Sequence, residues 1–309
     1  MELANSARSV FIGPTQPAMM VEAVAAGGGK VVEDPGAAEA IVWLGRPTAD
    51  LRSLLHVGIT WLQLPSAGVE NWISAGLVDG SRTVTSAAGS YGPQVAEHAL
   101  ALVLASLRRL ATCARATTWA PGTVRGASLR DSCVAIVGAG EIGRELITML
   151  GPLGARTIAV TRRGLPVSGA DESLPTERLA EALCAADVVV LAAPVTPATT
   201  HLMNAATLAQ LRPGAHLVNV GRGELVDTEA LLAALDGGQL AGAALDVTEP
   251  EPLPDGHPLW THPLALITPH TANPESLRLA SLARRLTENT SRFVAGQPLV
   301  AVVDPEIGY

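Results

Sequence analysis

Short apolar runs alternate with helix-like patterns along almost the whole chain of 309 residues. The runs that predict strands in the first third are 9–12, 30–33, 40–44, 60–64 and 83–86. The later ones are 133–137, 156–161, 187–191, 216–219, 241–246 and 264–268. Because strands that alternate with helices usually pair in parallel and are covered on both faces, this pattern predicts an α/β fold.

The chain length and two helical segments indicate how the chain is divided. At roughly 150 residues per domain, a chain of this length favours two domains. Residues 94–112 contain no Gly or Pro and are apolar on nearly every side, which predicts one long buried helix at the seam between domains. Residues 274–296 predict another long helix, and residues 299–303 predict a last strand that rejoins the first domain.

Charge and composition exclude several classes of function. With 21 basic and 29 acidic residues the formal charge is −8, which disfavours nucleic-acid binding and anionic membranes. Three widely spaced cysteines without a CxxC pair predict neither a metal site nor a disulfide framework. No apolar stretch reaches the roughly 18–20 residues of a membrane span, and the N-terminus lacks the apolar core of a signal peptide. We therefore expect a soluble, cytoplasmic protein.

A glycine-rich turn follows the apolar run 133–137 and opens the next helical pattern. It reads Gly138-Ala-Gly140-Glu141-Ile142-Gly143. Gly138 permits a tight turn, Gly140 lets the backbone approach a pyrophosphate, and Gly143 lets the helix pack close to the strand. The helix N-terminus adds N–H groups and partial positive charge. Strand, turn and helix together predict a dinucleotide site.

The end of the next strand indicates which dinucleotide binds. An Asp or Glu at this place would bind the ribose hydroxyls of NAD(H). This chain has Thr161, Arg162 and Arg163 there instead. Guanidinium groups bind phosphate through paired, charge-assisted hydrogen bonds, so the sequence favours NADP(H), with NAD(H) possible. A solvated surface pair of arginines is the structural alternative.

Three later segments place polar side chains where strands are expected to end. They are 219–227, 244–252 and 268–272. Ligands of open parallel sheets bind at the carboxyl ends of the strands. The side chains that we expect to converge there are Arg222, Asp246, Glu251 and His270. Glu249, two residues before Glu251, is the alternative partner for the histidine.

With these motifs in their order, the chain resembles the D-isomer-specific 2-hydroxyacid dehydrogenases, and within them the glyoxylate/hydroxypyruvate reductases. The matching stretches are Ser66-Ala-Gly-Val-Glu70, Val95-Ala-Glu-His98, Trp119, the glycine turn, Ala193-Pro194 with Thr199, and Pro269-His270. The resemblance implies two flavodoxin- or Rossmann-like domains with parallel sheets, the cofactor domain being inserted into the substrate domain. It implies a substrate domain at residues 1–97 with 275–309, a cofactor domain at 98–274, and a homodimer.

The same resemblance implies roles for individual residues. His270 would be the general acid/base, Glu251 its charge partner, and Arg222 the ligand of the substrate carboxylate and carbonyl. Ala67 and Gly68 would offer backbone N–H groups to the carboxylate, and Asp246 would bind the nicotinamide amide. The implied cofactor-binding residues are Gly138, Gly140, Glu141, Ile142, Gly143, Thr161, Arg162, Arg163, Ala193, Pro194, Thr199, Val220, Gly221, Arg222, Asp246, His270 and Ala272.

The reduction of a 2-oxoacid requires such a set of groups on chemical grounds. Hydride addition builds negative charge on the carbonyl oxygen, and a donor aimed at that oxygen is commonly worth about 3–4 kcal/mol. The oxygen then needs a proton from a group that titrates near neutral pH, as histidine does. A carboxylate beside the imidazole would favour its protonated form. Taken singly, Arg222 could be only a contact within its loop, and Glu251 only a solvated charge. We expect the other histidines, His98 included, to be structural.

Few residues of the sequence indicate which 2-oxoacid is the substrate. No cation lies in the residues directly before Ser66, which favours a small unphosphorylated 2-oxoacid such as glyoxylate or hydroxypyruvate. Trp43 ends an expected strand and is equally compatible with a pocket and with the core. A phosphoglycerate dehydrogenase-like enzyme and a dinucleotide-sensing, corepressor-like protein remain as alternatives. Formate dehydrogenases pair their histidine with a glutamine, so Glu251 argues against that reaction.

Overall fold

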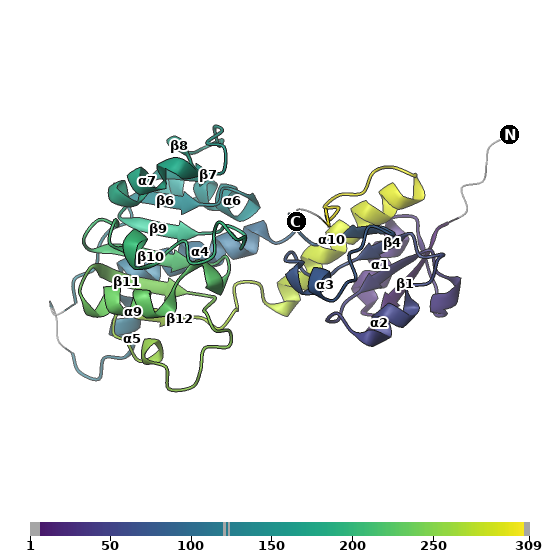
Figure 1. Cartoon of the computed structure of the whole chain (residues 1–309), viewed down its shortest axis with the longest axis horizontal. Helices are drawn as coiled ribbons and strands as arrows, with labels where there is room; N and C mark the ends of the chain where they lie inside the picture. Colours follow the sequence, from purple (N-terminus) through teal and green to yellow (C-terminus); the bar gives the residue numbers. More distant parts are fainter. Residues whose placement is uncertain (1–6, 120–121, 123, 306–309) are drawn as a thin grey trace. The chain divides into compact units, whose positions relative to one another are not determined.

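The computed structural model describes residues 7–119, 122 and 124–305 (Figure 1). The chain divides into two compact units: unit 1 contains Met1–Tyr91 and Pro274–Tyr309, and unit 2 contains Gly92–Asn273. The boundary that we predicted between residues 97 and 98 falls inside a helix that begins at Gly92 and belongs to unit 2. Which unit holds substrate and which holds cofactor stays a prediction.

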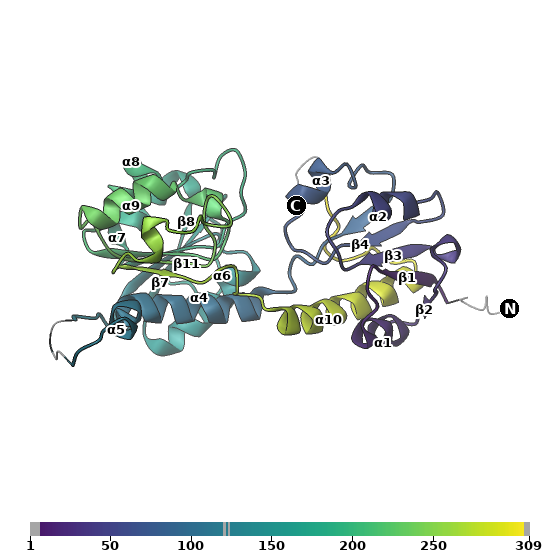
Figure 2. The same ribbon diagram turned by 90° about the horizontal axis from the view of Figure 1, so that it is seen from below.

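Unit 1 is built on one five-stranded parallel sheet. Its strands are β1 (Ser9–Gly13), β2 (Lys30–Val31), β3 (Ala40–Trp43), β4 (Trp61–Gln63) and β5 (Thr83–Thr85), in the order β2-β1-β3-β4-β5. Its helices are α1 (Ala18–Ala26), α2 (Ala49–Leu54), α3 (Glu70–Ser74) and α10 (Glu275–Val294). Figure 2 shows α1 and α10 on one face of the sheet and α2 and α3 on the other. This strand order is that of flavodoxin-like folds.

Unit 2 has a seven-stranded parallel sheet. Its strands are β6 (Cys133–Val137), β7 (Arg156–Thr161), β8 (Glu172–Pro175), β9 (Val188–Leu191), β10 (Ala215–Asn219), β11 (Leu240–Leu245) and β12 (Ala265–Ile267). They lie in the order β12-β11-β10-β9-β6-β7-β8, and every pair is parallel. The direction of winding reverses between β6 and β9, which is where doubly wound sheets bind their ligands. The predicted fold class, α/β with two parallel sheets, is confirmed.

The helices of unit 2 cover both faces of this sheet. They are α4 (Gly92–Leu107), α5 (Leu110–Ala114), α6 (Glu141–Leu150), α7 (Leu179–Ala185), α8 (Ala205–Leu208) and α9 (Thr228–Asp236). Helices α7, α8 and α9 lie on one face, and α4 and α6 lie on the other (Figure 2). Single 3₁₀ turns span Pro35–Ala37, Gly151–Leu153, Thr176–Arg178, Gly223–Leu225 and Pro258–Trp260.

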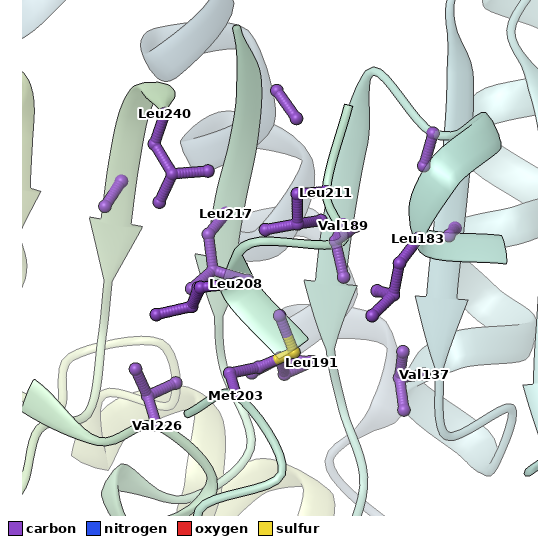
Figure 3. Close-up of a cluster of buried hydrophobic side chains, with 14 of the residues drawn as sticks. Val137, Leu183, Val189, Leu191, Met203, Leu208, Leu211, Leu217, Val226 and Leu240 are labelled. Carbon is purple, nitrogen blue, oxygen red and sulfur yellow. The ribbon is translucent and has the colours of Figure 1, made fainter. Parts of the chain in front are cut away.

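The hydrophobic core of unit 2 holds the strand ends in place. Figure 3 shows side chains of β9 and β10, among them Leu191 and Leu217, packed against Leu183 of α7 and Leu208 of α8. The central strands β6, β9 and β10 are buried along their whole length. Burial on both faces is what a continuous apolar run in a parallel sheet predicts. The loops at the carboxyl ends of these strands therefore start from fixed positions.

Two expected elements differ in the structure, and one strand was not expected. The single helix predicted for 94–112 is wrong, because Arg109 adopts a left-handed conformation with φ 56° between α4 and α5. That turn lets the Arg109 guanidinium donate to the carbonyl of Ala241, 2.5 Å away. Strand β8 was not predicted, since it is a short edge strand that ends in a proline. The strand predicted for 299–303 is reduced to one antiparallel bridge between Val302 and Thr85.

A buried histidine on β10 makes the stability of the fold depend on pH. His216 is 5% exposed, and its Nδ1 lies 2.7 Å from the hydroxyl of Ser106 on α4. Burial lowers the pKa of His216 to about 4, and the Arg109 guanidinium adds to this shift. In the unfolded chain an imidazole takes up its proton near pH 6.5. The fold therefore loses stability as the pH falls from about 6.5 to about 4, because only the unfolded chain binds the proton in this range.

We expect this histidine to remove about 2 kcal/mol of unfolding free energy between pH 7 and pH 5. Urea unfolding at pH 7 and at pH 5 measures this change in the free energy of unfolding, and the His216→Asn variant is measured in the same way for comparison. The Asn variant has lower stability at pH 7 but should lack this part of the pH dependence. Equal pH dependence in the two proteins would contradict the assignment to His216.

Candidate active site

The glycine turn lies between β6 and α6, beside the point where the sheet reverses. Gly138 has φ 96°, and a Cβ on it would lie 2.6 Å from the backbone nitrogen of Ala193. A Cβ on Gly143 would overlap the carbonyl oxygen of Gly138. On Gly140, by contrast, a Cβ would meet no atom within 4 Å. Protein packing thus accounts for two of the three glycines, and the third leaves open space at the N-terminus of α6, as a bound pyrophosphate requires.

The residues around this turn fit a dinucleotide. Thr199 closes the loop after β9, since its hydroxyl donates to the carbonyl of Pro194 at 2.8 Å and accepts from the N–H of Thr196 at 2.7 Å. At the end of β7, the Thr161 hydroxyl accepts from the N–H of Gly164 at 3.1 Å. The two arginines that follow Thr161 are exposed, and Glu141, Ile142 and Ala193 are half-buried. The residues that end β7 and follow it, Thr161 to Gly164, include no Asp or Glu.

The loop after β10 is shaped by a residue that the sequence analysis did not single out. Asn219 is fully buried, its Oδ1 accepts from the N–H of Gly221 at 3.0 Å, and its Nδ2 donates to the carbonyl of Arg222 at 2.8 Å. Arg222 is half-buried, and its Nη1 donates to the carbonyl of Gly221 at 2.9 Å. A Cβ on Gly223 would overlap the carbonyl of Thr248, so the loops after β10 and β11 touch.

Asp246 directly follows β11 and organises the loop that carries His270. It is 3% exposed, and its Oδ1 accepts from the hydroxyl of Thr268 at 2.7 Å and from the N–H of Thr271 at 2.9 Å. The N–H of Ala272 contacts both carboxylate oxygens, at 3.2 and 3.1 Å. The carbonyl of Asp246 accepts from the N–H of His270 at 2.8 Å. One residue therefore holds the backbone N–H groups of the histidine and of the two residues after it, together with the Thr268 side chain before it.

His270 and Glu251 meet at this edge of unit 2. The Nδ1 of His270 lies 2.6 Å from Oε1 of Glu251, and both side chains are about half exposed. The backbone of His270 is left-handed, with φ 52°. Glu249 instead lies beside His201, with 2.5 Å between Oε2 and Nε2. Of the two candidate partners, the structure thus brings Glu251 to His270 and turns Glu249 to a different histidine.

The residues predicted to bind the substrate carboxylate through their backbone lie in unit 1. Ala67 and Gly68 precede α3, and among the described residues neither N–H has a hydrogen-bond partner. The neighbouring Ser66 hydroxyl donates to the carbonyl of Gly68 at 2.6 Å and accepts from the indole N–H of Trp72 at 3.0 Å. This turn leaves two N–H groups available to an anion.

Two tryptophans that the sequence analysis named have different environments. Trp43 lies in the core of unit 1, and its indole N–H donates to the carbonyl of Arg46 at 2.9 Å. This favours the core interpretation of Trp43. Trp119 is 96% exposed.

Most histidines outside the site have local partners that account for them. His56 Nε2 contacts the carbonyl of Pro35, and His257 and His262 lie beside Glu229 and Asp236. His98 is different, because its Nε2 lies 2.9 Å from the Thr268 hydroxyl and 3.3 Å from Oδ1 of Asp246. His98 lies near the strand-end loops because α4 packs on the sheet. The spacing of residues along the sequence does not predict this packing.

The described part of the chain contains neither a candidate metal site nor a candidate membrane-spanning helix. Across residues 7–119, 122 and 124–305, the His, Cys, Asp and Glu side chains form no group of three that could hold a metal ion. In the same ranges, none of the helices has the length and apolar character needed to span a bilayer.

Comparison with known proteins identifies the family. Residues 99–272 match the family model "D-isomer specific 2-hydroxyacid dehydrogenase, NAD binding domain". An uncharacterised protein encoded in the proB 3′ region of Corynebacterium melassecola is 42% identical over 92% of this chain and 94% of its own length. The glyoxylate/hydroxypyruvate reductase A of Photorhabdus laumondii is 32% identical over 71% of this chain and 69% of its own.

A solved structure supports the same conclusion. The crystal structure of a D-isomer specific 2-hydroxyacid dehydrogenase from Xanthobacter autotrophicus Py2, in complex with NADPH and MES, is 30% identical. It aligns with a TM-score of 0.84 over 98% of this chain and 100% of that chain. The chain belongs to the D-isomer specific 2-hydroxyacid dehydrogenase family. It is therefore an NAD(P)-dependent oxidoreductase that uses a nicotinamide dinucleotide and a small-molecule substrate.

Proposed function

We propose that this enzyme reduces a small, unphosphorylated 2-oxoacid such as glyoxylate or hydroxypyruvate, with NADPH as the preferred cofactor. The observation that carries the proposal is the 2.6 Å contact between His270 and Glu251. It lies at the carboxyl edge of the sheet that bears the glycine turn and Arg222. The similarity to a glyoxylate/hydroxypyruvate reductase supports the substrate class.

The proposed mechanism assigns the proton to a named atom of His270. Because Nδ1 faces the Glu251 carboxylate, Nε2 is the ring nitrogen left to give a proton to the substrate oxygen. The carboxylate fixes the ring orientation and stabilises the imidazolium before transfer. A nicotinamide ring, when bound, supplies the hydride to the carbonyl carbon. Once the proton has left Nε2, the imidazole is neutral and still held at Nδ1.

Three further sets of groups would bind the substrate or the cofactor, and one of them would polarise the substrate carbonyl. The Arg222 guanidinium would donate to the carbonyl oxygen, where negative charge grows, and to the substrate carboxylate. In unit 1, the N–H groups of Ala67 and Gly68 keep the role that the family resemblance implies, as donors to a carboxylate. Asp246 would accept from the amide of the nicotinamide. Within the described residues its Oδ2 receives only the N–H of Ala272 and keeps lone pairs for a further donor.

The cofactor preference rests on the end of β7. A double substitution, Arg162→Ala with Arg163→Ala, should weaken NADPH binding about tenfold or more, because two exposed guanidinium groups no longer meet the 2′-phosphate. NADH binding should change much less. Fluorescence titration of both cofactors measures this. Arg178→Ala is the control, since it removes an exposed arginine paired with Glu181. Equal losses for both cofactors would show that the pair is only surface charge.

A panel of 2-oxoacids tested with NADPH and with NADH examines the proposal as a whole. We expect the highest kcat/KM with glyoxylate or hydroxypyruvate and NADPH. A clear preference for 3-phosphohydroxypyruvate would replace the proposal with a phosphoglycerate dehydrogenase-like activity. Tight NADPH binding with only trace turnover of every acid would favour a dinucleotide sensor of the corepressor type.

The proposal also includes a homodimer in the cytoplasm. The dimer follows from the family, and the cytoplasmic location from the composition, in which three widely spaced cysteines predict no disulfide framework. Sedimentation of the purified protein should give about twice the chain mass of 31.7 kDa. A monomer at micromolar concentration would contradict this part of the proposal.

A further inference from the structure

A chain of hydrogen bonds connects helix α4 to the residues around His270. The Nε2 of His98 lies 2.9 Å from the hydroxyl of Thr268 and 3.3 Å from Oδ1 of Asp246. The Thr268 hydroxyl lies 2.7 Å from the same carboxylate oxygen. The side chain of His98 is 23% exposed and that of Asp246 is 2% exposed. The chain is therefore largely shielded from water.

The direction of these hydrogen bonds follows from the number of protons available. An ionised carboxylate only accepts, so the single hydroxyl proton of Thr268 goes to Asp246. The Thr268 oxygen then has only lone pairs left for His98. Nε2 of His98 must therefore carry a proton and donate it. Because a carboxylate polarises a donor that it accepts from, each bond in this chain strengthens the next.

We propose that His98 is a positioning residue for the reaction and acts on His270 through Thr268 and Asp246. Asp246 holds the N–H groups of residues 270, 271 and 272, which keeps His270 in its left-handed conformation beside Glu251. His98 fixes the side of the carboxylate that faces α4. Loss of its N–H removes the donor to the Thr268 hydroxyl and one of the groups that fix Oδ1 of Asp246. The carboxylate can then shift, and with it the backbone that places the His270 imidazole against the substrate. This inference rests on the proposed role of His270.

Substitution of His98 tests the idea with a conservative rescue. His98→Leu should lower kcat about 10- to 100-fold, because a small displacement of a catalytic group has an effect of that size. The KM for NADPH should change less than kcat, because the glycine turn and the end of β7 are untouched, and the pH profile of kcat should shift. His98→Gln, which keeps an N–H near the position of Nε2, should recover most of the activity. Leu102→Ala is the control, since it removes a buried side chain from the same helix without touching the chain of hydrogen bonds.

A second substitution keeps the test decisive if His98→Leu does not fold. Thr268→Val removes only the hydroxyl and should lower kcat to a similar degree. The double variant should lose little more than either single one, since both interrupt the same chain of hydrogen bonds. Full additivity, or a loss equally large in Leu102→Ala, would overturn the proposal.

His270→Ala, measured alongside, separates this inference from the proposed function. If it is inactive while both His98→Leu and Thr268→Val keep wild-type kcat, only the positioning role fails. If His270→Ala keeps its activity, the proposed mechanism and the positioning role fail together.

Discussion

Replacement of His270 by alanine is expected to lower kcat for 2-oxoacid reduction by about 10²- to 10⁴-fold, the usual contribution of a positioned general acid. The alkoxide formed by hydride addition then has only water as a proton source. The dissociation constant of NADPH should change little, since the glycine turn and the end of β7 are untouched. The measurement is steady-state kinetics with glyoxylate, combined with titration of the cofactor.

The chain offers a matched control for this experiment. His201 and Glu249 form a second exposed histidine–glutamate contact of almost the same length, 2.5 Å, in the same unit. His201→Ala removes that contact without any predicted role in the reaction, so it should keep wild-type kcat. A mild effect of His270→Ala, or similar losses in both variants, would argue against the assigned acid.

The site residues that the sequence could place are those that directly follow a predicted strand. A run such as Cys133–Val137 predicts a buried strand, and parallel strands bring their carboxyl ends to one edge, so Glu251 and His270 could be expected to meet. The glycine turn is equally local, because strand, turn and helix follow one another directly. The family could likewise be named from these motifs, and the family model and relatives confirm it.

The remaining features depend on contacts between distant residues. The break at Arg109 has no Gly or Pro to signal it, and the guanidinium there donates to the backbone of β11, whose residues are far away in the sequence. Likewise, His98 is a polar residue on an apolar helix, and its partners Thr268 and Asp246 lie at strand ends that only the folded sheet brings near. Sequence spacing predicts which strand ends are neighbours but not which buried polar side chain supports them.

Arg222 is the second residue whose loss should have a large effect. Arg222→Ala is expected to lower kcat/KM for the oxoacid by about 10²- to 10³-fold, which corresponds to the 3–4 kcal/mol of one donor to a developing oxyanion. Arg222→Lys should recover only part of this, since an ammonium group keeps the charge but cannot donate two parallel hydrogen bonds to a carboxylate.

The backbone at position 222 should survive the substitution, which isolates the effect of the guanidinium. Asn219 holds this backbone through the Arg222 carbonyl, and no side-chain atom of residue 222 takes part in that bond. Cofactor contacts made by the loop backbone should therefore persist, and the dissociation constant of NADPH should change far less than kcat/KM. Arg212→Ala, which removes an exposed arginine paired with Asp187, controls for the loss of one positive charge from the unit. If Arg222→Ala instead weakened NADPH binding and substrate turnover in equal proportion, the guanidinium would belong to the cofactor site and another group would have to bind the 2-oxoacid.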